Sequence, residues 1–252
     1  MWFPFSEIKE LKFNFEEDAK IVVNFLKIRI TKFSDKIPDI SNLKLVNIDE
    51  INSFLTAKRA EEHAAGRFLL HEMLIKFYPH IDDRIIEVSR DLNRAPYFKW
   101  VEGSINSTPL PNFSISTSGG FVIVALCSSD YTIGVDIEKL NQKRAGSLFE
   151  FLSAGKELEQ IKNLYEKEDN KGINKIWTAK ESILKALRLG MSIPPTRIKI
   201  IDDDLNYKSI IEYEGENLYL NTEILELSED YCFSLAFKKI KKMRIAGIEP
   251  TT

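Results

Sequence analysis

Two apolar runs at residues 121–127 and 131–138 constrain the fold of this chain more than any other feature. The first run, FVIVALC, has the length and composition of a strand, and the second run is predicted to be another. Only Ser128-Ser129-Asp130 separates the runs, and a polar segment of that length is typical of a turn. The middle of the chain is therefore predicted to be two strands joined by a short turn.

Helices are predicted on either side of these strands. Asp49 is a candidate N-cap for a helix over about residues 51–77, whose apolar side chains recur at helical spacing. Residues 140–172 are predicted to be helical and polar. Asn174 is a candidate cap for a further helix that runs to about residue 189, with a glycine at position 190 as its stop.

The order of the elements favours an α+β fold, because helices and strands are segregated along the chain and do not alternate as in a parallel sheet. Residues 91–112, rich in proline, are predicted to be an extended loop. The strongest apolar strands of the two halves are residues 121–127 and 231–237. We therefore expect two similar α+β lobes with pseudo-two-fold symmetry, residues 1–138 and 139–252. Other predicted strands lie at residues 21–23, 26–30, 197–201, 210–213 and 218–220.

Composition narrows the class of protein. The chain has 252 residues, of which 44% are hydrophobic, and this is enough for a sizeable core. A net charge of −3 does not suggest a nucleic-acid partner. Cys127 and Cys232 are isolated in apolar runs and are predicted to be buried free thiols. No apolar run is long enough to span a membrane, and Pro4 and Glu7 break the N-terminal one, so we expect a soluble cytoplasmic protein without a membrane partner.

Asp136 and Glu138 form the first candidate site. Side chains at positions i and i+2 of a strand share a face, so these two carboxylates point the same way while Val135 and Ile137 point into the core. Two neighbouring carboxylates repel each other unless a cation joins them, and Mg²⁺ prefers oxygen ligands. Gly134 would allow a close backbone approach beside them. Taken alone, the pair fits the solvated edge of an amphipathic strand better than a metal site.

The second candidate site lies in residues 176–185, IWTAKESILK. On the predicted helix, Glu181 and Lys185 stand at positions i and i+4 and are neighbours on one face. Taken alone, they fit an ordinary helix salt bridge, and Trp177 fits a core position.

Together the two segments carry a much more specific signal. Gly134-Val135-Asp136 is followed, after about forty residues, by W-T-x-K-E-S-x-x-K. This combination resembles the signature of the 4′-phosphopantetheinyl transferases, (V/I)-G-(I/V)-D and then (F/W)-(S/C/T)-x-K-E-(A/S)-x-x-K, and every specified position is filled. The length of the chain resembles the larger, monomeric surfactin- and enterobactin-type class of that family.

The resemblance implies an activity and a set of site residues. A member of this family transfers the 4′-phosphopantetheine group from coenzyme A to a serine of an apo acyl, peptidyl or aryl carrier protein and releases 3′,5′-ADP. It implies Mg²⁺, with Mn²⁺ as an alternative, between Asp136, Glu138 and Glu181 in a cleft between the lobes. Lys180 and Lys185 would contact phosphate oxygens as point charges. Glu181 would accept the proton of the serine, with Glu157 or a metal-bound water as alternatives.

Upstream segments extend the resemblance over about residues 59–185. Residues 58–67, KRAEEHAAGR, are similar to the helix whose two arginines, here Arg59 and Arg67, hold phosphates of the coenzyme. Arg94 and Pro96 fall in the family's loop near the nucleotide. Ser116 and Thr117 fall where the family has a histidine that contacts a phosphate, and Thr117 can donate one hydrogen bond but carries no charge.

Two other functions are consistent with parts of the sequence. The threonine at position 117 is consistent with a non-catalytic homologue that binds coenzyme A or a carrier protein. Another Mg²⁺-dependent phosphate enzyme is the second alternative, although the sequence contains no P-loop and no H-x-E or C-x-x-C metal pattern. The natural carrier protein and the role of the C-terminal tail stay open.

Overall fold

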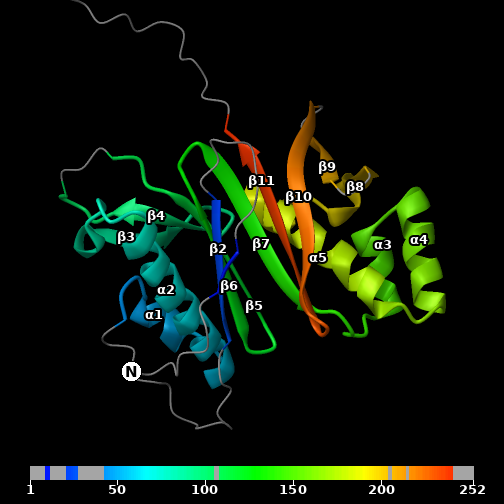
Figure 1. The fold of residues 1–252 in the computed structure, drawn as a ribbon, viewed down its shortest axis with the longest axis horizontal. Helices are drawn as coiled ribbons and strands as arrows, with labels where there is room; N and C mark the ends of the chain where they lie inside the picture. The colour runs from blue at the N-terminus through cyan, green and yellow to red at the C-terminus, as the bar shows by residue number, and fades with distance from the viewer. Residues whose placement is uncertain are drawn as a thin grey trace, which may run out of the picture.

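The computed structural model describes residues 9–11, 21–27, 43–104, 108–203, 206–213 and 216–240. It confirms the α+β class, with helices packed on antiparallel sheets (Figure 1). The predicted features at Pro4 and Glu7, part of the strand expected at 26–30, and the end of the C-terminal tail lie outside the described residues.

A four-stranded antiparallel sheet has the order β1-β2-β6-β5 and contains the central apolar run as β6 (Phe121–Cys127). Alternate side chains of β6 enter two different cores: Val122, Val124 and Leu126 pack with helix α2, while Ile123 and Ala125 pack with the second sheet. The run is continuous because β6 is buried on both faces. The other strands are β1 (Lys9–Leu11), β2 (Ile21–Lys27) and β5 (Asn112–Ser118).

Helix α2 (Ala57–Phe77) covers one face of this sheet and begins later than the sequence pattern indicated. The hydroxyl of Thr56 accepts a hydrogen bond from the Arg59 amide at 3.2 Å and caps the helix. Asp49 belongs instead to the short helix α1 (Ile48–Asn52), which is capped by Asn47. The expected single helix is therefore two helices, each with its own polar cap.

A two-stranded sheet occupies part of the region expected to be an extended loop. Strand β3 (Ile86–Arg90), which follows the single turn η1 (Asp83–Ile85), pairs in antiparallel register with β4 (Pro96–Trp100). Pro96 is tolerated because it is the first residue of its strand and needs no ladder donor there. The loop at residues 91–95 connects the two strands.

The second sheet has five antiparallel strands in the order β7-β11-β10-β9-β8. Its strands are β7 (Tyr131–Lys139), β8 (Ile198–Asp203), β9 (Asn206–Tyr213), β10 (Glu216–Ser228) and β11 (Tyr231–Lys239). Each predicted strand of this region is present, and most are longer than predicted. Side chains of β5 bind the neighbouring β7: the Ser114 hydroxyl accepts from the Val135 amide at 3.0 Å, and Asn112 Nδ2 donates to the Tyr131 carbonyl at 2.8 Å.

Helix α5 (Asn170–Leu187) lies across β7, β10 and β11 and starts four residues before the predicted cap. Asp169 caps it by accepting from the Gly172 amide at 3.0 Å, whereas Asn174 is fully buried in the helix. The helix ends at Arg188, which has left-handed backbone angles, and not at residue 190. A Cβ at Gly134 would lie 1.9 Å from the Ser182 carbonyl oxygen, so the predicted close backbone approach at Gly134 is confirmed.

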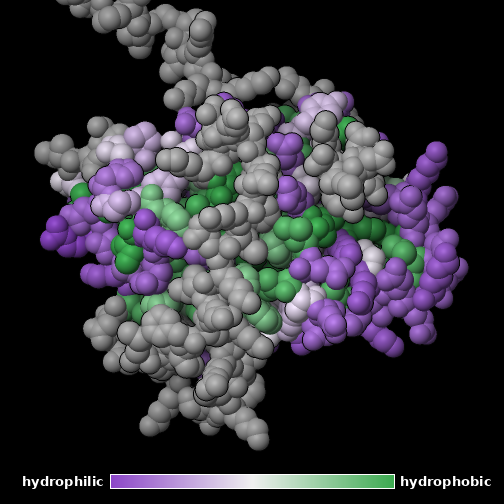
Figure 2. All heavy atoms as spheres, viewed as in Figure 1, coloured by the Kyte–Doolittle hydropathy of each residue, from purple (hydrophilic) through white to green (hydrophobic). Residues whose placement is uncertain are grey.

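Short helices complete the described part of the chain. Within the segment expected to be helical and polar, η2 (Gly146–Leu148), α3 (Phe149–Leu152) and α4 (Gly155–Glu166) precede α5. The turns η3 (Gly190–Ser192) and η4 (Pro195–Arg197) follow it. Figure 2 shows hydrophilic side chains gathered around α4 at one end of the molecule.

Three further expectations concern the whole chain. Both cysteines are buried and free, as predicted. Among the described helices, none is long and apolar enough to cross a membrane. The boundary expected between residues 138 and 139 stays a prediction; strand β7, at the end of the first expected lobe, pairs with β11 of the second.

Candidate active site

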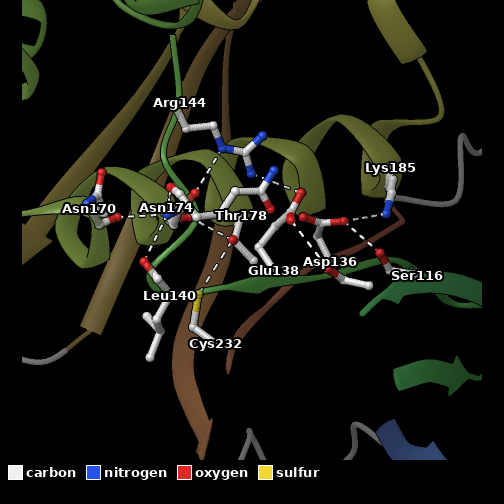
Figure 3. Close-up of polar contacts among 12 residues, drawn as sticks. Ser116, Asp136, Glu138, Leu140, Arg144, Asn170, Asn174, Thr178, Lys185 and Cys232 are labelled. Carbon is white, nitrogen blue, oxygen red and sulfur yellow. Dashed lines mark hydrogen bonds and ion pairs between the residues drawn. The ribbon is translucent and has the colours of Figure 1, made fainter. Parts of the chain in front are cut away.

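Asp136 on β7 is the centre of the candidate site (Figure 3). Its side chain is buried, and its Oδ1 atom accepts hydrogen bonds from Ser116 Oγ and Lys185 Nζ, both at 2.7 Å. Lys185 Nζ also donates to the Val135 carbonyl at 3.1 Å. The second oxygen, Oδ2, is buried without a hydrogen-bond partner. An unpartnered buried carboxylate oxygen is costly, so this atom is suited to receive a cation or a donor from a ligand.

Glu138 lies two residues further along the same strand and is held by an arginine that the sequence pattern did not reveal. Arg144 Nη2 is 3.1 Å from Glu138 Oε1, and the guanidinium lies 4.3 Å from the centre of the Trp177 ring. Trp177, the aromatic residue of the second motif, is therefore a platform for Arg144. Ser118 Oγ lies 3.5 Å from the other Glu138 oxygen.

Asn174 binds both Arg144 and the loop after β7 (Figure 3). Its Oδ1 accepts from Arg144 Nε at 2.8 Å, and its Nδ2 donates to the Leu140 and Gln142 carbonyls at 2.9 and 2.8 Å. The loop after β7 is thus bound to helix α5 by one buried amide. The sequence alone does not distinguish this buried asparagine from a helix N-cap, because a polar residue in either role is followed by an apolar stripe at helical spacing.

Glu181 and Lys185 lie on α5. Glu181 is close enough to Asp136 and Glu138 on β7 to interact with them electrostatically. Burial raises the pKa of the Glu181 carboxyl above its usual range; Asp136 and Glu138 raise it further, and Lys185 opposes them. Even so, no three His, Cys, Asp or Glu side chains in the described ranges are grouped so that they could hold a metal ion. The carboxylates are therefore near one another but are not arranged as a complete set of metal ligands.

Lys180 does not join this group, although the family resemblance implied a phosphate contact. Its side chain is 1% exposed, and its ammonium forms an ion pair with Glu157. It also donates to the Leu152 carbonyl at 2.8 Å, to Ser153 Oγ at 3.0 Å and to the Pro195 carbonyl at 3.2 Å. Burial lowers the pKa of Lys180, while the Glu157 charge opposes that shift. Lys180 and Glu157 thus join α5 to the α3–α4 segment.

Basic side chains of the first half surround a cavity of about 360 Å³ that reaches Asp136 and Lys185. Arg67 is 3% exposed, and its Nη1 atom is buried without a hydrogen-bond partner. Its Nη2 lies 3.7 Å from Glu50, which also pairs with Arg90. Arg90 is a lining residue that sequence reasoning missed, because its place follows from the pairing of β3 with β4. The other lining residues are Arg59, Glu62, His63, Pro96, Ile115, Ser116 and Thr117.

The loop at residues 91–96 forms one wall of a second cavity of about 220 Å³. Arg94 and Pro96 line it on one side, and Glu181 and Lys185 of α5 line it on the other. Arg94 has a φ of 64°, a left-handed backbone conformation that non-glycine residues rarely adopt. Thus every predicted site residue except Lys180 and the alternative base Glu157 lines one of these cavities or lies beside Asp136. Arg59 is exposed, with 62% of its side chain accessible.

Sequence comparison relates part of the chain to known proteins. Residues 132–236 match the model of the 4′-phosphopantetheinyl transferase superfamily, and this segment contains Asp136, Glu138, Glu181 and Lys185. The chain is 25% identical over 182 residues to the Homo sapiens protein named L-aminoadipate-semialdehyde dehydrogenase-phosphopantetheinyl transferase, covering 69% of this chain and 58% of that protein. It is 29% identical over 157 residues to the Bacillus subtilis protein named 4′-phosphopantetheinyl transferase ffp, covering 58% and 66%. The chain therefore aligns with less than two thirds of either relative.

Proposed function

We propose that this chain is a member of the 4′-phosphopantetheinyl transferase superfamily, whose model matches residues 132–236, and that it transfers 4′-phosphopantetheine from coenzyme A to a serine of an apo carrier protein. The single observation that carries the proposal is the state of Asp136. One oxygen of this buried carboxylate is held by Ser116 and Lys185, and the other has no hydrogen-bond partner. A site of this kind is prepared for a ligand that brings positive charge or a donor.

The carboxylates are also candidate ligands for a divalent cation, although among the described residues they are not grouped as a complete metal site. Asp136, Glu138 and Glu181 offer the oxygen donors that Mg²⁺ prefers, and Mn²⁺ is compatible with the same set. Burial, and then the charges of Asp136 and Glu138, raise the pKa of Glu181, and a cation among the three groups would relieve the repulsion between them. When bound, the ion would neutralise charge on the pyrophosphate oxygens of coenzyme A.

Binding of the coenzyme's phosphates is supported by the basic cavity beside Asp136. Arg67 has a buried and unpartnered Nη1, and a guanidinium binds phosphate oxygens at two points. Arg90, which is 38% exposed, adds a second guanidinium to the lining of the cavity, and Arg59 adds charge at the exposed rim. We propose that these three residues supply the positive charge that Thr117 cannot, with Ser116 and Thr117 as neutral hydrogen-bond donors.

The transfer step uses groups of α5. The serine hydroxyl attacks the β-phosphorus of coenzyme A, a bond forms between its oxygen and phosphorus, and the bridging P–O bond breaks. 3′,5′-ADP leaves with the electron pair of that bond. Glu181 is proposed to take the proton of the serine, because its carboxyl group lines the same cavity as Lys185. Lys185 neutralises charge that develops on the phosphoryl oxygens.

The remaining elements of the proposal are the partners and the arrangement of the chain. The natural acceptor would be an acyl, peptidyl or aryl carrier protein, and we expect the enzyme to act as a cytoplasmic monomer. Residues 1–138 and 139–252 would form two lobes around the site. The site is built from α2 and β5 on one side and α5 on the other, with β7 between them, which supports this division.

The test is to incubate the protein with coenzyme A, Mg²⁺ and several apo carrier proteins, and then to measure the carriers by mass spectrometry. A mass gain of one phosphopantetheine arm is expected on at least one carrier. Binding of coenzyme A without a mass gain on any carrier would favour the non-catalytic homologue. Release of phosphate without carrier modification would favour a hydrolase.

A further inference from the structure

Arg188 bridges α5 and the loop at residues 91–96. Its Nε and Nη2 atoms donate to Asp91 Oδ2 at 3.1 and 2.9 Å. Its Nη1 donates to the Pro96 carbonyl at 3.2 Å, and its Nη2 also lies 3.3 Å from the Ala95 carbonyl. The guanidinium further lies 5.6 Å from the centre of the Tyr97 ring. One side chain thus contacts four residues of a segment about ninety positions earlier in the sequence.

A side chain of the loop also binds the backbone of Arg188, and the Asp91 carboxylate binds the backbone of the loop itself. Asn93 Nδ2 donates to the Arg188 carbonyl at 3.0 Å. Asp91 Oδ1, the oxygen that Arg188 does not use, accepts from the Asn93 and Ala95 amides at 3.0 and 2.8 Å. The Asp91 carboxylate therefore holds the turn of its own loop with one oxygen and the end of α5 with the other.

The backbone at this junction is strained in two places. Arg188 has a φ of 57° and Arg94 a φ of 64°, and both are left-handed conformations that a glycine would adopt without steric cost. Strained residues persist only where surrounding contacts hold them. At Arg188 those contacts are made by its side chain and by Asn93, which binds the Arg188 carbonyl, so the left-handed backbone and the bridge belong to one feature.

The bridge spans two groups of functional residues. Arg94 and Pro96 of the loop and Glu181, Lys185 and Arg188 of α5 all line the cavity of about 220 Å³. Glu181, Lys185 and Arg188 follow one another at positions i, i+4 and i+7, so they share one face of the helix. Lys185 contacts the centre of the site, and Arg188 lies one turn further along.

We propose that Arg188 is a positioning residue that holds the Asp91–Pro96 loop at a fixed place relative to Glu181 and Lys185. Its effect on catalysis rests on the proposed function, because the loop is there a coenzyme-binding element. A planar guanidinium suits this role, since it can reach a carboxylate and two carbonyls at once, which a lysine ammonium cannot do in the same geometry.

The test compares Arg188→Gly with Arg84→Gly. Arg84 is a matched control, because it forms a similar two-point contact with Asp82, at 2.9 and 2.8 Å, away from the lining residues of the cavities. Arg188→Gly removes the bridge but also the left-handed strain, so we expect little change in thermal midpoint. We expect amide hydrogen exchange at Asn93 and Ala95 to accelerate about tenfold, and KM for coenzyme A to rise about tenfold with kcat changed less than about twofold. Arg84→Gly should change neither the exchange at these two amides nor the KM for coenzyme A.

Arg188→Lys provides a second variant that keeps the length and charge of the side chain. It should show faster exchange at the amides of Asn93 and Ala95, since one ammonium cannot make all the hydrogen bonds of the forked guanidinium. Unchanged exchange and unchanged KM in both Arg188 variants would overturn the proposal. If the wild-type protein modifies no carrier, the proposed function fails, and the exchange rates together with the Kd for coenzyme A still decide the role of Arg188.

Discussion

Lys185 Nζ lies 2.7 Å from Asp136 Oδ1, although the two residues are 49 positions apart in the sequence, one on helix α5 and the other on strand β7. This contact is the physical link between the two sequence motifs. It exists because Gly134 lets α5 approach β7 so closely that a single methyl group would collide with the Ser182 carbonyl. The first motif thus supplies a carboxylate, and the glycine before it allows the second motif to reach it.

Asp136→Asn should abolish most of the activity with little loss of stability. The amide keeps the shape of the side chain but removes the charge that Lys185 and a cation would share, so we expect kcat to fall at least about 100-fold. Initial rates at saturating coenzyme A and Mg²⁺ measure this. Glu150→Gln is the control, because Glu150 is exposed and pairs only at 3.6 Å with Lys162. Near-wild-type turnover of Asp136→Asn would remove Asp136 from the site.

Glu181→Gln should lose activity at least about 100-fold and yet stabilise the metal-free protein at neutral pH. The pKa of Glu181 is raised in the folded state, so folding favours its protonated form. The resulting cost to stability is fully present above the folded pKa and disappears as pH falls below the unfolded value near 4.5. The gain in thermal midpoint from Glu181→Gln should therefore be largest at neutral pH and shrink as pH is lowered toward 4.5.

Without metal, Glu181→Gln should have the higher thermal midpoint. Added Mg²⁺ should give the wild type the higher midpoint instead, because the ion stabilises its charged carboxylate and not the amide of the variant. Thermal unfolding of both proteins with and without Mg²⁺ measures the difference. An equal shift in both proteins would show that Glu181 is not a ligand.

Strand and helix existence could be predicted well from the sequence where one physical signal dominated. The β6 run was found with its bounds because it is apolar on both faces. The cap residues could not be predicted. Asn174 and Asp49 are of residue types that favour caps, but Asp169 and Thr56 make the capping hydrogen bonds. Propensity cannot decide which of several nearby polar residues meets the free amides.

The candidate site was predictable only where residues are close in sequence or resemble the family pattern. Asp136, Glu181 and Lys185 were identified by their motifs and are close together in the structure. Arg144 and Arg90 were missed, because their partners Glu138 and Glu50 are brought to them by the fold. Lys180 was assigned to phosphate by resemblance, whereas its place in the structure follows from burial between α5 and α4.

Gly134→Ala should destabilise the protein by about 3 kcal/mol or more, because the new methyl group would overlap backbone atoms of α5 that cannot move independently. Equilibrium unfolding in urea measures the change. Gly146→Ala is the matched control: a Cβ there meets only Phe149, at 3.9 Å, and should change stability by less than about 1 kcal/mol. Equal stability of the two variants would contradict the close packing of α5 on β7.

Lys180→Met should also act through stability, at a cost of about 3 kcal/mol, because it leaves the Glu157 charge without its partner. Adding Glu157→Gln to this variant should recover part of the loss, since the stranded charge is then removed. Urea unfolding of the single and double variants gives the coupling free energy. If Lys180→Met instead kept full stability and lost affinity for coenzyme A, the phosphate contact implied by the family pattern would be correct.

The most direct test of the account is the mass of an apo carrier protein after incubation with this protein, coenzyme A and Mg²⁺, beside the same carrier with its acceptor serine replaced by alanine. The account predicts a gain of one phosphopantetheine arm on the serine carrier, none on the alanine carrier, and none on either when Lys185→Met replaces the wild type. A serine carrier that gains no mass with the wild-type protein, across acyl, peptidyl and aryl carriers, would contradict it.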